Sequence, residues 1–178
     1  PVNLNIPGEK ELTGRGVSYC ATCDGWFFKD KDVVVVGGGD SALEEGIFLT
    51  RYAKSVTVVH RRDALRAGAI LQKRAHENTK IKFQLNSIPV AIQGEKAVTT
   101  LRVKDVITGE ERDLATDGVF IFIGHSPNTQ LFKGQVDMDK SVAEAMTGTP
   151  VLVLDAGNDP RMQYPKEAKE EGIASMLT

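Results

Sequence analysis

Two cysteines, three positions apart, are the residues in this chain whose types and spacing point most directly to chemistry. Cys20-Ala-Thr-Cys23 is followed at once by Asp24, and the 178 residues contain no other cysteine. Close-spaced cysteines carry two electrons by passing between dithiol and disulfide, and a neighbouring acid handles the proton that accompanies them. A disulfide that closes so short a ring adds little stability. We therefore predict a redox-active pair with Asp24 as its acid.

A zinc half-site is the main alternative for the cysteine pair. Zinc needs two further ligands, and the histidines at positions 60, 76 and 125 are scattered without the spacing of a zinc motif. We therefore expect no metal site. A thioredoxin fold is also disfavoured, because it would place the pair after its own strand and no apolar strand is predicted directly before Cys20.

A glycine-rich segment follows the cysteines and fits the G-x-G-x-x-A pattern of dinucleotide-binding turns. Gly37 would make the tight turn, Gly39 would let a pyrophosphate approach the backbone, and Ala42 would allow close packing of helix on strand. The intervening Asp40 and Ser41 belong to the same candidate site, where the helix start offers free N–H groups to an anion. An ordinary glycine-rich turn without a ligand is the alternative.

Glu44 has two interpretations that do not exclude each other. The spacing Ser41-x-x-Glu44 is that of a capping box, in which Glu44 only stabilises the helix start. The same position would face the nicotinamide end of a bound dinucleotide.

Basic residues follow the second predicted strand, where a dinucleotide-binding fold meets the adenosine ribose. NAD enzymes usually place an acidic residue there, but this chain has His60, Arg61 and Arg62, with Arg66 one helical turn further on. The planar arginine side chain pairs well with phosphate. The cluster therefore favours the 2′-phosphate of NADP, with a solvated basic loop as the alternative.

The elements that must position these residues are predicted from apolar runs, turn residues and periodicity. A β-branched strand over 32–36, a helix over 41–53 and a strand over 55–60 form a βαβ unit. A second helix is expected from Asp63, as its N-cap, to about Asn78. Further strands are expected over 81–85, 98–106, 112–114, 117–123 and 150–154, with a last helix over 166–177.

Composition indicates an ordinary globular chain. The hydrophobic fraction is 41%, the charged fraction is 26% and the net charge is −2, so neither nucleic acid nor a membrane is an expected partner. The apolar runs are too short to span a bilayer, and the polar start predicts no signal peptide. Two cysteines used for chemistry fit a reducing, cytoplasmic location.

Taken together and in order, these segments resemble bacterial-type, low-molecular-weight thioredoxin reductase. The resemblance covers residues 1 to about 140. Its segments are Gly16-Val-Ser-Tyr-Cys-Ala-Thr-Cys-Asp-Gly25, the turn from Gly37 through Asp40-Ser-Ala-Leu-Glu-Glu45, His60-Arg-Arg-Asp63 with Arg66, Phe120-Ile-Phe-Ile-Gly-His-Ser-Pro-Asn-Thr129, and Val136-Asp-Met-Asp-Lys140.

The resemblance implies a Rossmann-like α/β domain of the flavoproteins with two dinucleotide-binding domains, having a parallel sheet and a β-meander crossover. It implies that NADPH reduces FAD, that the flavin reduces the Cys20–Cys23 disulfide, and that the dithiol reduces thioredoxin in a usually homodimeric enzyme. His60, Arg61, Arg62 and Arg66 would hold the 2′-phosphate, and Ile123 and Gly124 would lie against the nucleotide.

By the same resemblance, residues 1–15 would be a linker from an FAD domain, 16–132 the NADPH domain, and 133–178 a remnant of the FAD domain. The chain has only one glycine-rich fingerprint, and Ala156-Gly-Asn-Asp159 only partly matches the motif that touches the flavin, so it looks like a fragment or truncated form. The alternatives are a flavin reductase for another thiol partner and a non-catalytic NADPH-binding redox sensor.

Overall fold

A computed structural model of the 178-residue chain describes residues 1–125, 152–153 and 176–177. The chain divides into two compact units, Pro1–Ile123 and Gly124–Thr178. In the second unit, β9 (Leu152–Val153) pairs antiparallel with β10 (Met176–Leu177). The strand expected over 150–154 therefore contains β9, whereas the helix expected over 166–177 is wrong at its end. The other residues of these two segments, and the predicted boundary at 132, lie outside the described residues.

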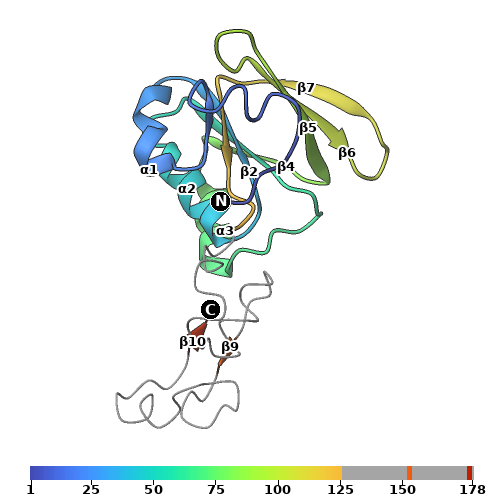
Figure 1. The fold of residues 1–178 in the computed structure, drawn as a ribbon. Coiled ribbons are helices and arrows are strands. Elements are labelled where there is room, and N and C mark those ends of the chain that lie inside the picture. Colours follow the sequence, from blue (N-terminus) through green and yellow to red (C-terminus); the bar gives the residue numbers. More distant parts are fainter. Residues whose placement is uncertain (126–151, 154–175, 178) are drawn as a thin grey trace, which may run out of the picture. The chain divides into compact units, whose positions relative to one another are not determined.

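A five-stranded parallel sheet forms the centre of the first unit (Figure 1). Its strands, in spatial order, are β1 (Val17–Ser18), β8 (Gly118–Ile121), β2 (Asp32–Val36), β3 (Ser55–Val59) and β4 (Ile81–Gln84). The predicted βαβ unit is present, since β2 and β3 are adjacent and pair in register from Asp32–Ser55 to Val36–Val59.

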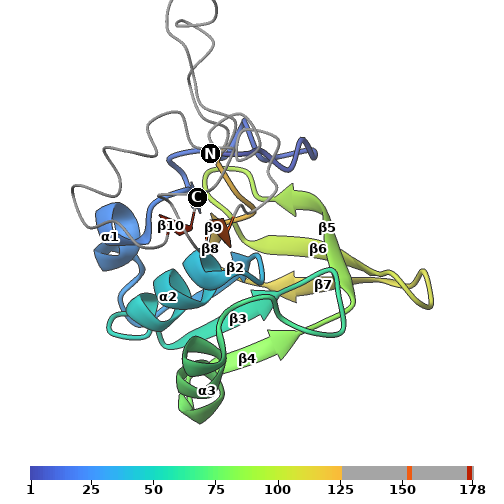
Figure 2. The ribbon, with the colours of Figure 1, turned by 90° about the horizontal axis from the view of Figure 1, so that it is seen from below.

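Both faces of this sheet are covered, which explains the continuous apolar run of β2. Val33 and Val35 pack in a cluster with the helices, whereas Val34 and Val36 pack on the opposite side. Figure 2 shows α2 (Asp40–Leu49) and α3 (Ala69–Glu77) over one face of the strands. A short helix α1 (Ala21–Asp24) leads into the 3-10 helix η1 (Gly25–Phe28) beside α2.

A three-stranded antiparallel sheet covers the other face and joins β4 to β8. It consists of β5 (Ser87–Gln93), β6 (Thr100–Asp105) and β7 (Glu111–Ala115). This arrangement confirms the predicted β-meander crossover. β5 was not among the predicted strands. It contains Pro89, and its pairing register shifts between Pro89 and Ala91, as is usual for proline in a sheet.

The two helices predicted after β2 and after β3 are both shorter than expected. The second was expected from Asp63, but α3 begins at Ala69 after Gly68 as N-cap. The intervening residues form a loop whose backbone donates hydrogen bonds to the glycine-rich turn instead of to a helix. The first helix ends at Leu49, where Thr50, Arg51 and Tyr52 continue as turns.

The first fifteen residues pack against the same unit. Leu12 is buried, and Leu4 and Ile6 contact the cluster on the meander side of the sheet. The backbone N–H of Ile92 in β5 donates to the carbonyl oxygen of Pro7. This segment therefore forms part of the compact unit that contains the glycine-rich turn.

Candidate functional site

The glycine-rich turn lies where β2 ends and α2 begins. Gly37 has φ +149°, a conformation that favours glycine, and a β-carbon on it would overlap the carbonyl oxygen of Phe122. The same β-carbon would lie 2.8 Å from that of the fully buried Ala42. The spatial constraints expected at Gly37 and Ala42 are therefore present.

Gly39, in contrast, has open space beside it. It is the N-cap of α2, and a β-carbon built on it meets nothing within 4 Å. Its side is therefore open to a ligand at the helix N-terminus, where free N–H groups and the helix dipole favour an anion. The capping box is wrong: the helix begins at Asp40, its N-cap makes no side-chain hydrogen bond, and both Ser41 and Glu44 are exposed.

The basic loop is tied directly to this turn. The backbone N–H groups of Arg66 and Ala67 donate to the carbonyl oxygen of Gly38, at 2.7 and 3.1 Å. Asp40 accepts a hydrogen bond from the N–H of Gly68 at 2.7 Å, so its carboxylate holds the end of the loop. These bonds place the arginines of the loop beside the glycine-rich turn.

A cavity of about 380 Å³ opens at this point, at the carboxyl ends of the parallel strands. In open α/β sheets, ligands bind outside these strand ends. The predicted site residues that line it are Gly37, His60, Arg61, Arg66 and Ile123. The further lining residues are Val2, Leu4, Val36, Gly38, Val59, Ser87, Ile88, Pro89 and Phe122. Arg62 is exposed and not among the lining residues.

His60 is 93% buried (7% exposed) under the glycine-rich turn. A β-carbon on Gly38 would overlap its imidazole ring, so the ring requires glycine at that position. Burial lowers the pKa of His60 below its usual value, and the positive charges of Arg66, Arg61 and Arg62 add to this effect. Among the described residues, the buried Nε2 atom of His60 has no hydrogen-bond partner.

The two cysteines form a disulfide at the start of α1. Cys20 is the N-cap, and its Sγ accepts a hydrogen bond from the backbone N–H of Cys23 at 3.2 Å. Cys20 is half-buried and Cys23 is exposed. Against our expectation, a strand does precede the pair, since β1 ends two residues before Cys20. With only two residues it was too short for periodicity to reveal, and it pairs with β8 in the Rossmann-like sheet.

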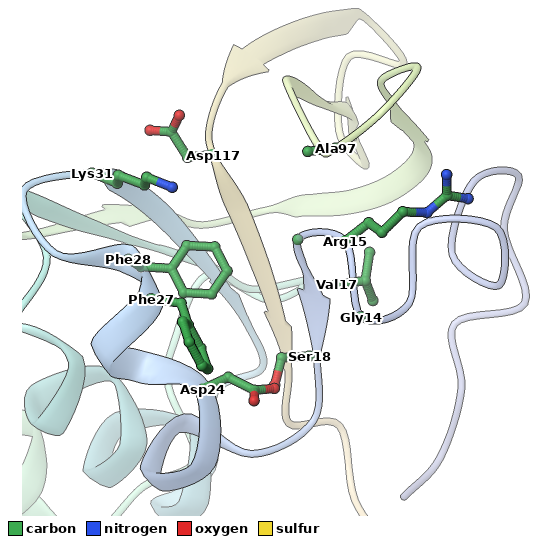
Figure 3. A pocket seen from close by; sticks show the side chains of 11 residues that line it. Gly14, Arg15, Val17, Ser18, Asp24, Phe27, Phe28, Lys31, Ala97 and Asp117 are labelled. Atoms are coloured by element: carbon green, nitrogen blue, oxygen red, sulfur yellow. The ribbon is translucent and has the colours of Figure 1, made fainter.

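Asp24 is held by a side chain that sequence reasoning missed. The hydroxyl of Ser18 donates to Asp24 Oδ2 at 2.6 Å. Both residues line a second cavity of about 280 Å³, where Figure 3 shows their side chains turned toward each other. The two cavities share no lining residue.

Tyr19, next to Cys20, takes part in a separate cluster with the buried Glu9. The Tyr19 hydroxyl donates to Glu9 Oε1 at 2.8 Å, and the backbone N–H groups of Leu4 and Asn5 donate to the same carboxylate. Burial, together with this carboxylate, raises the pKa of Tyr19 to about 12. Glu9 thereby fixes the segment that carries Leu4 into the wall of the cavity at the glycine-rich turn.

Some of the cavity-lining residues that were not predicted carry a recognisable sequence signal, and others carry none. Gly38 stands in the glycine triplet and could have been included with its neighbours. Val2 and Leu4 belong to a segment without periodicity, and Ser87 to Pro89 belong to the unpredicted β5. Gly124, with φ +127°, does not line the cavity. In the described part of the chain, no group of three or more potential metal ligands is found.

The model of one protein family, described as "Pyridine nucleotide-disulphide oxidoreductase", matches residues 1–146. The chain belongs to this family. The name of this family pairs a pyridine nucleotide with a disulfide.

Individual relatives carry a more specific name. The thioredoxin reductase of Streptomyces clavuligerus is 54% identical over 160 residues, which are 88% of this chain and 50% of that protein. The bifunctional thioredoxin reductase/thioredoxin of Mycobacterium leprae is 57% identical over 136 residues, 76% of this chain and 30% of that protein. The crystal structure of Lactococcus lactis thioredoxin reductase is similar with a TM-score of 0.74 and 47% identity, over 75% of this chain and 45% of that one. The chain thus spans half or less of the length of these relatives.

Proposed function

We propose that this chain is the NADPH-binding and disulfide-bearing part of an NADPH-dependent thioredoxin reductase. The observation that carries the proposal is the cavity in which the glycine-rich turn meets Arg61 and Arg66. A dinucleotide needs a turn for its pyrophosphate, and the 2′-phosphate that distinguishes NADPH from NADH needs a cationic partner. The cavity offers both.

The described residues fit NADPH in detail. The open side of Gly39 and the N-terminus of α2 would receive the pyrophosphate. Arg61 and Arg66 would pair with the 2′-phosphate, and Arg62 would add positive charge nearby. The Nε2 atom of His60, which has no partner among the described residues, would contact the same end of the nucleotide. Glu44 and Ile123 would lie along the rest of the nucleotide. Bound NADPH supplies a hydride, which carries two electrons.

The disulfide is the electron acceptor in this proposal. Reduction of Cys20–Cys23 takes up two electrons and two protons, and Asp24 would handle one of those protons. Trp26 and Phe27 follow the disulfide and are 63% and 70% exposed, an apolar surface that suits a protein substrate. Thioredoxin is the proposed substrate, because one relative is named as a fusion with thioredoxin. A cytoplasmic homodimer is the proposed form, by the family resemblance. Among the described residues no helix has the length and apolarity to cross a bilayer.

FAD is expected from the family resemblance, but the described residues do not make a site for it. The sequence has one glycine-rich fingerprint, and the cavity beside it is assigned to NADPH. We therefore assign residues 1–15 as the linker from an FAD domain, 16–132 as the NADPH domain and 133–178 as a remnant of the FAD domain.

Thiol trapping tests this function. The purified chain is incubated with NADPH or with dithiothreitol, alkylated, and analysed by mass spectrometry. We expect both cysteines to be modified together after dithiothreitol and to stay protected with NADPH alone, because hydride needs a flavin to become thiol chemistry. Adding the FAD domain of a thioredoxin reductase in trans should make NADPH effective.

Three results would speak against parts of the proposal. Cysteines that stay protected after dithiothreitol, with stoichiometric zinc in the sample, would identify a metal site. Reduction by NADPH alone, with bound yellow flavin, would show that the chain holds a complete flavin site. Tight NADPH binding without reduction, even in the presence of the FAD domain, would favour a redox sensor.

A further inference from the structure

Ser18 is a buried polar residue without a role in the function proposed so far. It is the second residue of β1, is 5% exposed, and pairs in register with Phe120 of β8. Its hydroxyl oxygen lies 2.6 Å from Asp24 Oδ2, 3.1 Å from the backbone nitrogen of Cys20 and 3.2 Å from the carbonyl oxygen of Cys20. One serine side chain therefore contacts both the disulfide loop and the acid.

The direction of these hydrogen bonds follows from the chemistry of a hydroxyl group. A serine has one proton to donate, and the short bond to a carboxylate is the stronger of the two choices. The backbone N–H of Cys20 donates to the oxygen lone pair. The result is a chain of two hydrogen bonds, from Cys20 N–H to Ser18 Oγ and from Ser18 Oγ–H to Asp24 Oδ2.

These two hydrogen bonds fix Asp24 to the sheet. Asp24 lies at the end of α1, a helix of four residues that packs beside α2, whereas Ser18 is part of the parallel sheet. In Figure 3 the Asp24 carboxylate reaches back across the loop to Ser18. The other charged residues that line the same cavity are Arg15, Lys31 and Asp117.

We propose that Ser18 is a positioning residue for Asp24, the neighbour of Cys23 in α1, and that the carboxylate held in this way transfers the proton that accompanies disulfide reduction. This inference rests on the proposed redox role of Cys20, Cys23 and Asp24. General acid–base catalysis depends on such placement, because the proton must be within hydrogen-bond reach of its acceptor.

The reaction that isolates this step uses a small dithiol. One thiol of dithiothreitol loses its proton to the Asp24 carboxylate and attacks a cysteine sulfur. The Cys20–Cys23 bond breaks, and the other cysteine leaves as a thiolate that takes up this proton from Asp24. The second thiolate of the reductant then displaces the first cysteine from the mixed disulfide. Two electrons pass to the protein, two protons end on its thiols, and the reductant leaves as a cyclic disulfide.

The experiment measures the rate of this reduction in the full chain by quenching with an alkylating reagent. The variants are Ser18→Ala, Ser18→Thr, Asp24→Asn and the Ser18→Ala/Asp24→Asn double variant. Ser55→Ala is the matched control, because the Ser55 hydroxyl also donates to a carboxylate, Asp32, at 2.6 Å. Rates are compared at several pH values. The ratio of the rates of two variants at the same pH cancels the effect of the ionisation of dithiothreitol.

We expect Ser18→Ala to slow reduction by roughly tenfold, the effect of losing one charge-assisted hydrogen bond. Ser18→Thr keeps the hydroxyl and should react near the wild-type rate. The double variant should be no slower than Asp24→Asn alone, since the two residues act as one unit. The ratio of wild-type to Ser18→Ala rates should change with pH, while the ratio for Ser55→Ala stays flat.

The proposal is overturned if Ser18→Ala reacts like the wild type, or if the effects of Ser18→Ala and Asp24→Asn multiply. If Ser18→Ala does not fold, the hydroxyl proton of Ser18 in the wild-type chain decides the matter by NMR. A slowly exchanging proton that is sensitive to Asp24→Asn supports the proposal, and a rapidly exchanging one overturns it. Because the reductant is dithiothreitol, a failure of NADPH binding would not produce any of these results.

Discussion

The imidazole ring of His60 packs directly on the backbone of Gly38, so closely that residue 38 has no room for a β-carbon. His60 directly follows β3, and Gly38 lies in the turn after β2. The contact therefore joins the ends of these two neighbouring strands, where the cavity opens. The middle glycine of the triplet is therefore required by a neighbouring side chain, whereas Gly39 faces open space.

Alanine substitutions at these two glycines should separate stability from nucleotide binding. Gly38→Ala should push His60 aside and lower the free energy of unfolding by about 1–3 kcal/mol, as for an overpacked core. Gly39→Ala meets nothing in the protein and should leave stability nearly unchanged, but its methyl group would stand where a pyrophosphate approaches. Chemical denaturation and NADPH titration of both variants check this. Equal stability of the two variants would contradict the packing of His60 on Gly38.

Stability should depend on pH through His60. Its pKa is lowered in the folded chain, so between that lowered pKa and about 6.5 the unfolded chain binds more protons. The free energy of unfolding should therefore rise with pH through this window and fall on acidification. Denaturation across this pH range should show a shallower dependence in His60→Gln, and His76→Gln is the control because His76 is exposed. Identical profiles for wild type and His60→Gln would contradict the burial of a neutral His60.

The Tyr19 hydroxyl should lose its proton only at high pH. Its pKa is about 12, because the side chain is partly buried and its hydroxyl donates to Glu9. In a spectrophotometric titration of the three tyrosines, Tyr19→Phe should remove the component with the highest pKa. Glu9→Gln should lower that pKa only in part, since burial is the larger cause. A Tyr19→Phe variant that retains the late component would show that the Tyr19–Glu9 bond is not formed in solution.

Much of the fold could be predicted because its signals are local. The run Val33–Val36 predicts a strand covered on both faces, and Gly37 with Ala42 predicts the turn that follows it. The predicted helix start at Asp63 is wrong because the N–H groups of Arg66, Ala67 and Gly68 donate to Gly38 and Asp40, and such long-range partners leave no periodic pattern.

The candidate site could be predicted in its chemistry but not in all its contacts. Cysteine spacing and the run of arginines point to a disulfide and a phosphate without further context. Ser18 and Leu4 could not be found in this way, because a serine in a two-residue strand and a leucine in an aperiodic segment acquire their roles only when the chain folds. The distinction between Arg66, which lines the cavity, and Arg62, which does not, also depends on the path of the loop.

Recognition of the 2′-phosphate is tested most directly by titrating NADPH and NADH against wild type, Arg61→Ala/Arg66→Ala and Arg62→Ala. The wild-type chain should bind NADPH more tightly. The double variant should weaken NADPH by about a hundredfold or more, since each charged hydrogen bond contributes about 1.5–3 kcal/mol, and leave NADH almost unchanged. Arg62→Ala should have the smaller effect, because Arg62 does not line the cavity. Equal dissociation constants for the two nucleotides in the wild-type chain, or unaltered selectivity in the double variant, would contradict the assignment.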